Sequence, residues 1–233
     1  MHRPTVADVA RTIDHAVLRP ELTAEDLARQ AAMCVARGVG CICVRPCDVA
    51  AAVRLVATAP VAVASVVGFP HGSHRTETKV FESRLALADG ASEFDMVMNV
   101  GRFLSGDEAA VHDDIAAVVA AVKPQGGLVK VILETCLLSP GQITAACRIA
   151  AAAGADFVKT STGFGINPHG PTGATPAAVR LMLAAVDGRL GVKASGGIRS
   201  WDDAVMYLAL GCRRLGVGDA AAILDGGARN GRE

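Results

Sequence analysis

The sequence predicts a (β/α)8 TIM barrel formed by one domain that spans residues 1–233. Short β-branched runs alternate with Ala-rich amphipathic stretches along the chain, and no linker-like or low-complexity tract separates them. The length of 233 residues is near the ~250 residues typical of such barrels. No G-x-G-x-x-G follows the first predicted strand, which disfavours a doubly wound open sheet.

The strands and helices are expected to alternate in a regular order. Short apolar runs predict strands at 11–15, 40–44, 61–67, 93–99, 128–134, 156–159, 190–194 and 213–216. Amphipathic stretches between them predict helices at about 24–37, 47–58, 76–89, 106–122, 140–153, 176–187 and 201–210. Helix starts are marked by Ser139 with Gln142, a capping box, and by Thr175 before a proline. Helix ends are marked by Gly38, Gly90 and Gly154.

Composition excludes several classes of partner. Lys+Arg 23 balance Asp+Glu 23, so no basic surface for nucleic acid is expected. The uncharged stretch 55–74 is interrupted by Pro60, Gly68 and Pro70, which indicates a buried strand and no membrane partner. The chain starts without the apolar segment of a secretory signal.

The cysteines predict reduced thiols and a cytoplasmic location. Seven cysteines are an odd number spread over a long chain, unlike a small disulfide framework. Cys41-x-Cys43-x3-Cys47, with His71 and His74 further on, lacks the second paired cluster of a structural zinc site. We therefore expect no metal.

The lysines are the most informative residues. The chain has five, and three of them lie inside apolar strands: Lys130, Lys159 and Lys193. Burial penalises an ammonium group unless carboxylates or a ligand compensate it. A buried ion pair would explain one such lysine, but three beside the strand acids favour amine chemistry on a carbonyl. The pattern therefore indicates an enzyme that forms a Schiff base.

Seven motifs in order resemble those of the deoxyribose-phosphate aldolase family over about residues 11–225. The most specific are the K-T-S-T-G segment that begins at Lys159 and the V-K-A-S-G-G-I-R segment around Lys193. The others are Ile13-Asp14-His15, Cys43-Val44-Arg45-Pro46, Gly68-Phe69-Pro70-His71-Gly72, Glu93-Phe94-Asp95-Met96-Val97-Met98-Asn99 and Val129-Lys130-Val131-Ile132-Leu133-Glu134-Thr135.

The resemblance implies a class I aldolase that reversibly cleaves 2-deoxy-D-ribose 5-phosphate to acetaldehyde and D-glyceraldehyde 3-phosphate, without metal or cofactor. It implies that Lys159 is the Schiff-base nucleophile and that Asp95 and Lys193 form the proton-relay pair. A lysine amine has a pKa of about 10.4, and this pKa must be lowered before the amine can attack an aldehyde at neutral pH. Lys193 can lower the pKa of Lys159, while Asp95 holds Lys193 protonated. A homodimer is also what the family suggests.

The substrate pocket is expected to use further residues at the strand ends. The resemblance assigns Asp14, Cys43, Lys130, Thr160 and Gly163 to the pocket, with Glu134 beside it, and His71 to its rim. Phosphate is expected at the loops after the last two strands, where exposed backbone N–H groups lie near helix starts. These N–H groups belong to Gly196-Gly197 and Gly216-Val217-Gly218.

Two alternatives remain open at this stage. Gly218-Asp219 replaces two hydroxyl residues common in the family, so Asp219 either repels a phosphate or caps the helix that follows. The first case favours an aldolase for an unphosphorylated or different aldehyde. A non-catalytic metabolite-binding barrel is the more distant alternative, and the intact Lys159, Lys193 and Asp95 argue against it. The loop 163–175 looks longer than usual and is a candidate lid.

Overall fold

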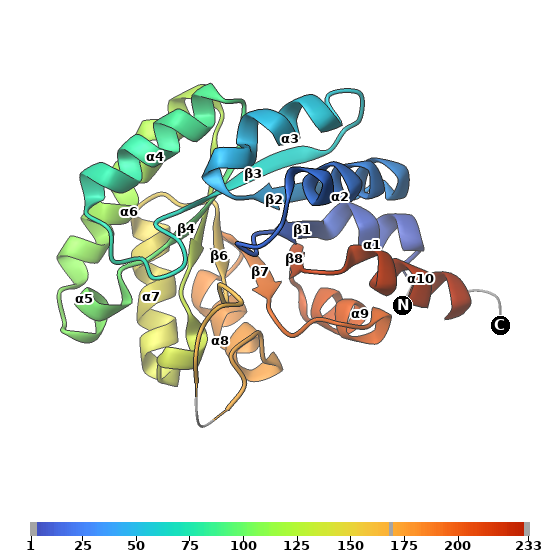
Figure 1. Cartoon of the computed structure of the whole chain (residues 1–233). Helices are drawn as coiled ribbons and strands as arrows, with labels where there is room; N and C mark the ends of the chain where they lie inside the picture. The colour runs from blue at the N-terminus through green and yellow to red at the C-terminus, as the bar shows by residue number, and fades with distance from the viewer. Residues whose placement is uncertain (1–3, 168–169, 231–233) are drawn as a thin grey trace.

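The strands form a closed barrel in which each pairs in parallel with the next and the last with the first (Figure 1). The computed structural model describes residues 4–167 and 170–230. The predicted (β/α)8 barrel is confirmed. The strands are β1 (Ile13–Val17), β2 (Cys41–Val44), β3 (Ala62–Val67), β4 (Glu93–Val97), β5 (Leu128–Ile132), β6 (Phe157–Lys159), β7 (Gly191–Ser195) and β8 (Arg214–Val217).

The helices lie outside the barrel (Figure 1). The predicted start signals hold, because the Ser139–Gln142 capping box and the Thr175 cap both form. The helices are α1 (Val6–Thr12), α2 (Ala24–Arg37), α3 (Val49–Val56), α4 (Thr76–Ala88), α5 (Val100–Leu104), α6 (Glu108–Val122), α7 (Pro140–Ala152), α8 (Pro176–Val186), α9 (Trp201–Leu210) and α10 (Ala220–Asn230).

The N-terminal boundary differs from the prediction. Thr5 and Asp8 form a capping box that starts α1, and this helix continues to Thr12. The first strand therefore begins at Ile13 rather than at residue 11, and it extends to Val17. The reciprocal side-chain and backbone hydrogen bonds of the box satisfy N–H groups at the helix start, and this signal outweighs the apolar content of the segment.

Two predicted strands end earlier than expected. Strand β4 stops at Val97, because the side chain of Asn99 accepts a hydrogen bond from the Arg102 N–H and starts the short helix α5. Strand β5 stops at Ile132, and Glu134 has a left-handed backbone with φ 55°. A non-glycine residue in this conformation is uncommon and occurs most often where surrounding contacts hold it.

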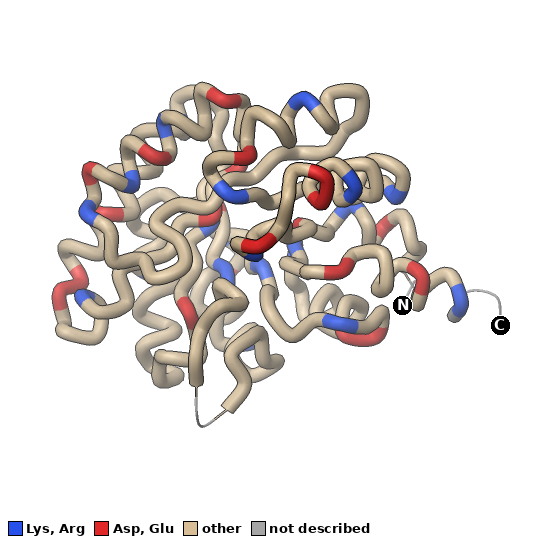
Figure 2. Tube along the Cα trace, in the orientation of Figure 1, with Lys and Arg blue, Asp and Glu red and all other residues tan. Residues whose placement is uncertain are grey.

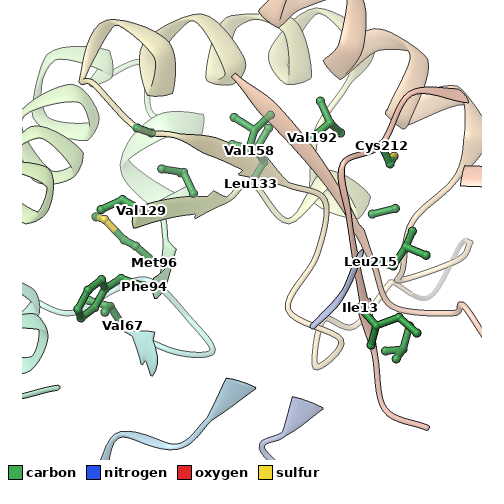
Figure 3. Close-up of a cluster of buried hydrophobic side chains, with 14 of the residues drawn as sticks. Ile13, Val67, Phe94, Met96, Val129, Leu133, Val158, Val192, Cys212 and Leu215 are labelled. Atoms are coloured by element: carbon green, nitrogen blue, oxygen red, sulfur yellow. The ribbon is translucent and has the colours of Figure 1, made fainter. Parts of the chain in front are cut away.

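The core lies between the strands and the helices. Alternate residues of each strand point to opposite faces. In β4, Phe94 and Met96 are fully buried in the apolar layer that surrounds the barrel (Figure 3), while Asp95 pairs with lysines of other strands. In β4 this alternation sends Phe94 and Met96 outward to the helices and Asp95 into the barrel. Apolar residues of β2 and β3, including Cys43 and Val66, form a second, smaller cluster.

Candidate active site

Charged side chains converge inside the barrel. Figure 2 shows Lys, Arg, Asp and Glu positions at the centre of the molecule, among the strands, as well as along the outer helices. The central ones include the predicted residues Asp14, Asp95, Lys130, Lys159 and Lys193, each at most 3% exposed.

Asp95 is the hub of this cluster. Its Oδ2 accepts hydrogen bonds from Nζ of Lys159 and from Nζ of Lys193, each at 2.7 Å. Its Oδ1 accepts one from Nζ of Lys130 at 2.9 Å. Burial alone would raise the pKa of Asp95, but the three ammonium groups overcome this and hold it well below its usual range. Asp95 is therefore a carboxylate at neutral pH.

Lys193 is held in its charged form. Besides Asp95, its Nζ donates to Oδ2 of Asp14. Burial opposes the charge, yet the two carboxylates raise the pKa of Lys193 above that of a free lysine. The same balance lowers the pKa of Asp14, because Lys130 and Lys193 outweigh its burial.

Lys159 has the opposite balance. Burial lowers the pKa of its amine; Asp95 opposes this shift, and the positive charge of Lys193 adds to it. A larger fraction of Lys159 is then unprotonated at neutral pH than for a free lysine. Of the three strand lysines only Lys159 has a lowered pKa, which is the property that attack on a carbonyl carbon requires.

Cys43 lies on β2 beside the same carboxylate. Its Sγ is 4.0 Å from Oδ2 of Asp95. Burial raises the pKa of the thiol to about 11, and the charge of Asp95 contributes. The group is therefore a neutral thiol at physiological pH and a weak nucleophile.

The K-T-S-T-G segment is anchored on both sides. The hydroxyl of Thr160 donates to the Ser195 carbonyl and accepts from the Ser195 N–H, each at 3.0 Å, so Thr160 ties β6 to β7. The hydroxyl of Thr162 donates to Oε2 of Glu134 at 2.5 Å. Burial raises the pKa of Glu134, although its hydrogen bonds with Thr162 oppose this. Thr160 thus contacts backbone, and its part in substrate binding stays a prediction.

Arg214 and Glu93 complete the cluster; sequence reasoning counted Glu93 only among the strand acids beside the lysines and did not single out Arg214. The guanidinium of Arg214 contacts Oδ1 of Asp14 at 2.7 Å and Oε1 of Glu93 at 2.8 Å. Nζ of Lys130 contacts Glu93 at 2.5 Å and Asp14 at 3.0 Å. The signal was available, because Arg214 is a charged residue two positions before Gly216 in an apolar strand, on the same face.

The carboxylates of this region are already compensated by cations. Among residues 4–167 and 170–230, Asp14, Cys41 and Glu93 form the one group with ligand atoms close enough together for a metal ion. Lys130 contacts both of those carboxylates, and so does Arg214. A metal ion would have to displace these two cations, so the donor set does not suit one. The Cys47, His71 and His74 side chains do not join this group.

Four of the predicted glycines lie after strands β6, β7 and β8, whereas Gly216 is a buried residue inside β8. Gly163 follows β6, and Gly196 and Gly197 follow β7, all three with positive φ. Gly218 is exposed in the turn between β8 and α10. Their N–H groups are at the same end of the parallel barrel as the ammonium of Lys159, which suits a substrate with a charged tail.

The end of the loop 163–175 packs against the turn that follows β7. The Ala174 N–H donates to the carbonyls of Ser195 and Gly196, each at 3.0 Å. The Tyr207 hydroxyl donates to the Ala174 carbonyl at 2.8 Å. Phe164, near the loop start, contacts Phe69 edge to face, with ring centroids 5.3 Å apart. Residues 168 and 169 lie outside the described residues, so the predicted lid remains a prediction.

Gly216 provides the space that Lys193 occupies. A methyl group at this position would lie 2.5 Å from Oγ of Ser195, 2.9 Å from its Cβ and 3.2 Å from Cε of Lys193. Gly216→Ala is expected to displace Lys193 and to lower kcat by about 10- to 100-fold, because small misplacements of reacting groups are costly. Steady-state kinetics measure this. Gly141→Ala, with no atom within 4 Å of the added methyl, is the control, and equal rates for both variants would contradict the expectation.

A barrel with a buried amine of lowered pKa, bound to a carboxylate that also binds a second lysine, defines a lysine-dependent carbonyl enzyme. Residues 9–212 match the model of the DeoC/LacD family aldolases. The chain belongs to this family. It is 49% identical over 227 residues to a deoxyribose-phosphate aldolase of Mycobacterium avium, covering 96% of this chain and 98% of that protein. It is 45% identical to one of Thermococcus gammatolerans, covering 96% and 97%.

Solved structures agree with the sequence relatives. A deoxyribose phosphate aldolase from Aeropyrum pernix, described as having a unique tetrameric structure, has a TM-score of 0.86 and 33% identity over 95% of this chain and 91% of that chain. QR15, described as an aldolase, has a TM-score of 0.89 and 34% identity, covering 97% and 98%. The resemblance found in the motifs is therefore confirmed.

Proposed function

We propose that this chain is a class I aldolase that reversibly cleaves 2-deoxy-D-ribose 5-phosphate to acetaldehyde and D-glyceraldehyde 3-phosphate. The observation that carries the proposal is the Lys159 amine, buried, lowered in pKa and 2.7 Å from the carboxylate that also holds Lys193. Relatives 45–49% identical over nearly the whole chain bear the name of this activity. The test is release of D-glyceraldehyde 3-phosphate from the sugar by the purified chain.

The reaction needs a nucleophile and a route for protons. The unprotonated Lys159 amine attacks C1 of the open-chain sugar, and loss of water gives a protonated imine. Removal of the proton from the C3 hydroxyl breaks the C2–C3 bond and releases D-glyceraldehyde 3-phosphate. The electron pair of the broken bond moves into the imine to give an enamine. Protonation at C2 and hydrolysis then release acetaldehyde and regenerate Lys159. We assign the passage of these protons through water to Asp95 together with Lys193, whose Nζ donates to the Asp95 carboxylate.

The phosphate of the substrate is assigned to the turns after β7 and β8. Gly197 and Gly218 leave the backbone open there, whereas Gly216 is buried inside β8 and Gly196 is packed against Gly173. Helix α10 starts at Ala220, two residues after Gly218. A helix start with accessible N–H groups favours an anion. We assign Asp14, Cys43 and Lys130 to the floor of the substrate pocket, because Cys43 and Lys130 contact Asp95 and Lys130 also contacts Asp14.

A second candidate is an aldolase of the same mechanism that prefers an unphosphorylated aldehyde, because Asp219 adds a negative charge beside the proposed phosphate site. However, Oδ1 of Asp219 accepts a hydrogen bond from the Ala222 N–H at 3.0 Å. This is the geometry of a helix N-cap. The side chain is also exposed, so water screens its charge. We therefore favour the phosphorylated substrate.

Asp219→Ala tests this choice. The loss of the cap is expected to reduce the free energy of unfolding by about 1 kcal/mol. The ratio of specificity constants for 2-deoxyribose 5-phosphate and 2-deoxyribose is expected to change by less than about 5-fold. Urea unfolding and the two kinetic assays measure these quantities. A rise in the ratio of about 5- to 30-fold, which corresponds to 1–2 kcal/mol, would favour the unphosphorylated substrate instead.

Assembly and location are further parts of the proposal. We infer a homodimer from the resemblance to the family, and the Aeropyrum pernix relative is described as a tetramer. Sedimentation analysis at several concentrations distinguishes these states. No helix in the described part of the chain is long and apolar enough to cross a membrane. We propose a cytoplasmic location, which is consistent with seven free cysteines.

A further inference from the structure

The salt-bridged groups inside the barrel do not balance in charge when every one of them is ionised; the buried Glu134, which pairs with Thr162 and has a pKa raised by burial, lies outside this network. Four basic groups face three carboxylates inside the barrel, and their contacts form one connected network. The basic groups are Lys130, Lys159, Lys193 and Arg214, and the acids are Asp14, Glu93 and Asp95. Such a network is neutral only when one basic group is uncharged, and excess charge is costly in a buried site.

The contacts identify which group gives up its proton most easily. Lys130 contacts all three carboxylates. Lys193 contacts Asp14 and Asp95. Lys159 contacts Asp95 alone, through the oxygen that Lys193 also uses. Loss of the proton from Lys159 therefore sacrifices the fewest ion pairs.

Arg214 differs from the lysines because a guanidinium stays charged in proteins. It bridges Asp14 and Glu93 at 2.7 and 2.8 Å. Glu93 lies two residues before Asp95 on β4, so this pair is one layer further from the barrel mouth than the reacting amine. The ion pairs of Arg214 and Glu93 do not include Lys159. Their charges therefore act on Lys159 at longer range and through the groups that lie between.

We propose that Arg214 and Glu93 are positioning residues that set the charge of this network so that Lys159 is its unprotonated member. The inference rests on the proposed Schiff-base function. Without Arg214, the carboxylates of Asp14 and Glu93 pair more strongly with Lys130 and Lys193. Asp95 then pairs mainly with Lys159, and this ion pair stabilises the protonated form of Lys159. Without the charge of Glu93, one positive charge is in excess, and Lys159 loses its proton more readily.

Other titratable groups near Lys159 and Arg214 are the same in every variant that is compared. Cys43 on β2 and Glu134 after β5 act electrostatically on Lys159, and Cys41 on β2 acts on Arg214. None of them changes in the variants below. A shift between variants therefore reports the pair alone.

The test is the pH dependence of Schiff-base formation at Lys159. The full chain is incubated with acetaldehyde and cyanoborohydride between about pH 5 and pH 9, and the rate of labelling of the Lys159 peptide is followed by mass spectrometry. The acidic limb of this profile reports protonation of the amine. Arg214→Met is expected to move the limb up by about one pH unit, and Glu93→Gln to move it down by a similar amount.

The double variant Arg214→Met with Glu93→Gln supplies the decisive comparison. It restores the charge balance, so its limb is expected to return to that of the unchanged enzyme. Arg214→Lys, which retains the charge, is also expected to keep the limb near its original position. Arg213→Met removes an exposed guanidinium from the adjacent position and is the matched control without a shift.

A merely structural role gives a different result. Thermal unfolding of each variant is measured in parallel, and a loss of stability without movement of the limb would overturn the inference. The inference would also be overturned if the acidic limb of the double variant moved as far as that of either single variant. This comparison can be made even if one of the single variants does not fold. Failure of the unchanged enzyme to label at Lys159 would overturn the proposed function and this inference together, whereas labelling without shifts would overturn this inference alone.

Discussion

Lys159→Leu is expected to abolish aldol cleavage, with a loss in kcat of at least about 10⁴-fold. The reason is that, of the three strand lysines in the network, only Lys159 has a lowered pKa. Lys130 and Lys193 have raised pKa values, because the carboxylates around them outweigh their burial. Neither can replace Lys159 at neutral pH. The rate of release of D-glyceraldehyde 3-phosphate measures the effect.

Covalent trapping locates the same nucleophile independently. Borohydride added in the presence of acetaldehyde is expected to add mass to the peptide that contains Lys159, and to leave Lys159→Leu unlabelled. Lys123→Leu is the control, since Lys123 is half exposed and pairs with Asp156 outside the cluster. Labelling of the peptide that contains Lys130 or Lys193 in the unchanged enzyme would contradict the assignment.

Asp95→Asn and Lys193→Leu are each expected to lower kcat by at least about 10²-fold, the lower range for loss of a positioned acid or base. The two substitutions differ in their effect on Lys159. Loss of the Asp95 charge lowers the pKa of Lys159 further, so imine trapping should persist while turnover falls. Loss of the Lys193 charge raises the pKa of Lys159, so trapping should need a higher pH.

The comparison of trapping and turnover separates proton transfer from folding. Asp95 contacts three buried lysine side chains, so rates are normalised to the folded fraction measured by circular dichroism. Asp113→Asn, on the exposed side of α6, is the matched control for Asp95→Asn. Turnover near that of the unchanged enzyme in Asp95→Asn or Lys193→Leu would remove that residue from the mechanism.

The sequence predicted the secondary structure correctly where the interactions that decide it are local. Strand and helix order follow from apolar periodicity, and the starts of α7 and α8 follow from Ser139 and Thr175. Two of the boundaries that were wrong lie where a cap competes with an apolar run, at Thr5 and Asn99, and a third lies where Glu134 adopts a left-handed backbone. The buried lysines were recognisable for a similar reason, because charged residues inside apolar strands are costly and need a purpose.

By itself, the sequence determined the barrel, the motifs of the family and the three strand lysines. Only the tertiary structure decided which carboxylate each ammonium contacts. Arg214 lies 200 residues from Asp14 and 121 from Glu93, and Lys193 lies 179 residues from Asp14. These contacts exist because β8 closes against β1 and brings side chains from opposite ends of the chain into one space. The pKa of Lys159 depends on that shared space, since electrostatic interaction follows distance and burial rather than separation along the chain.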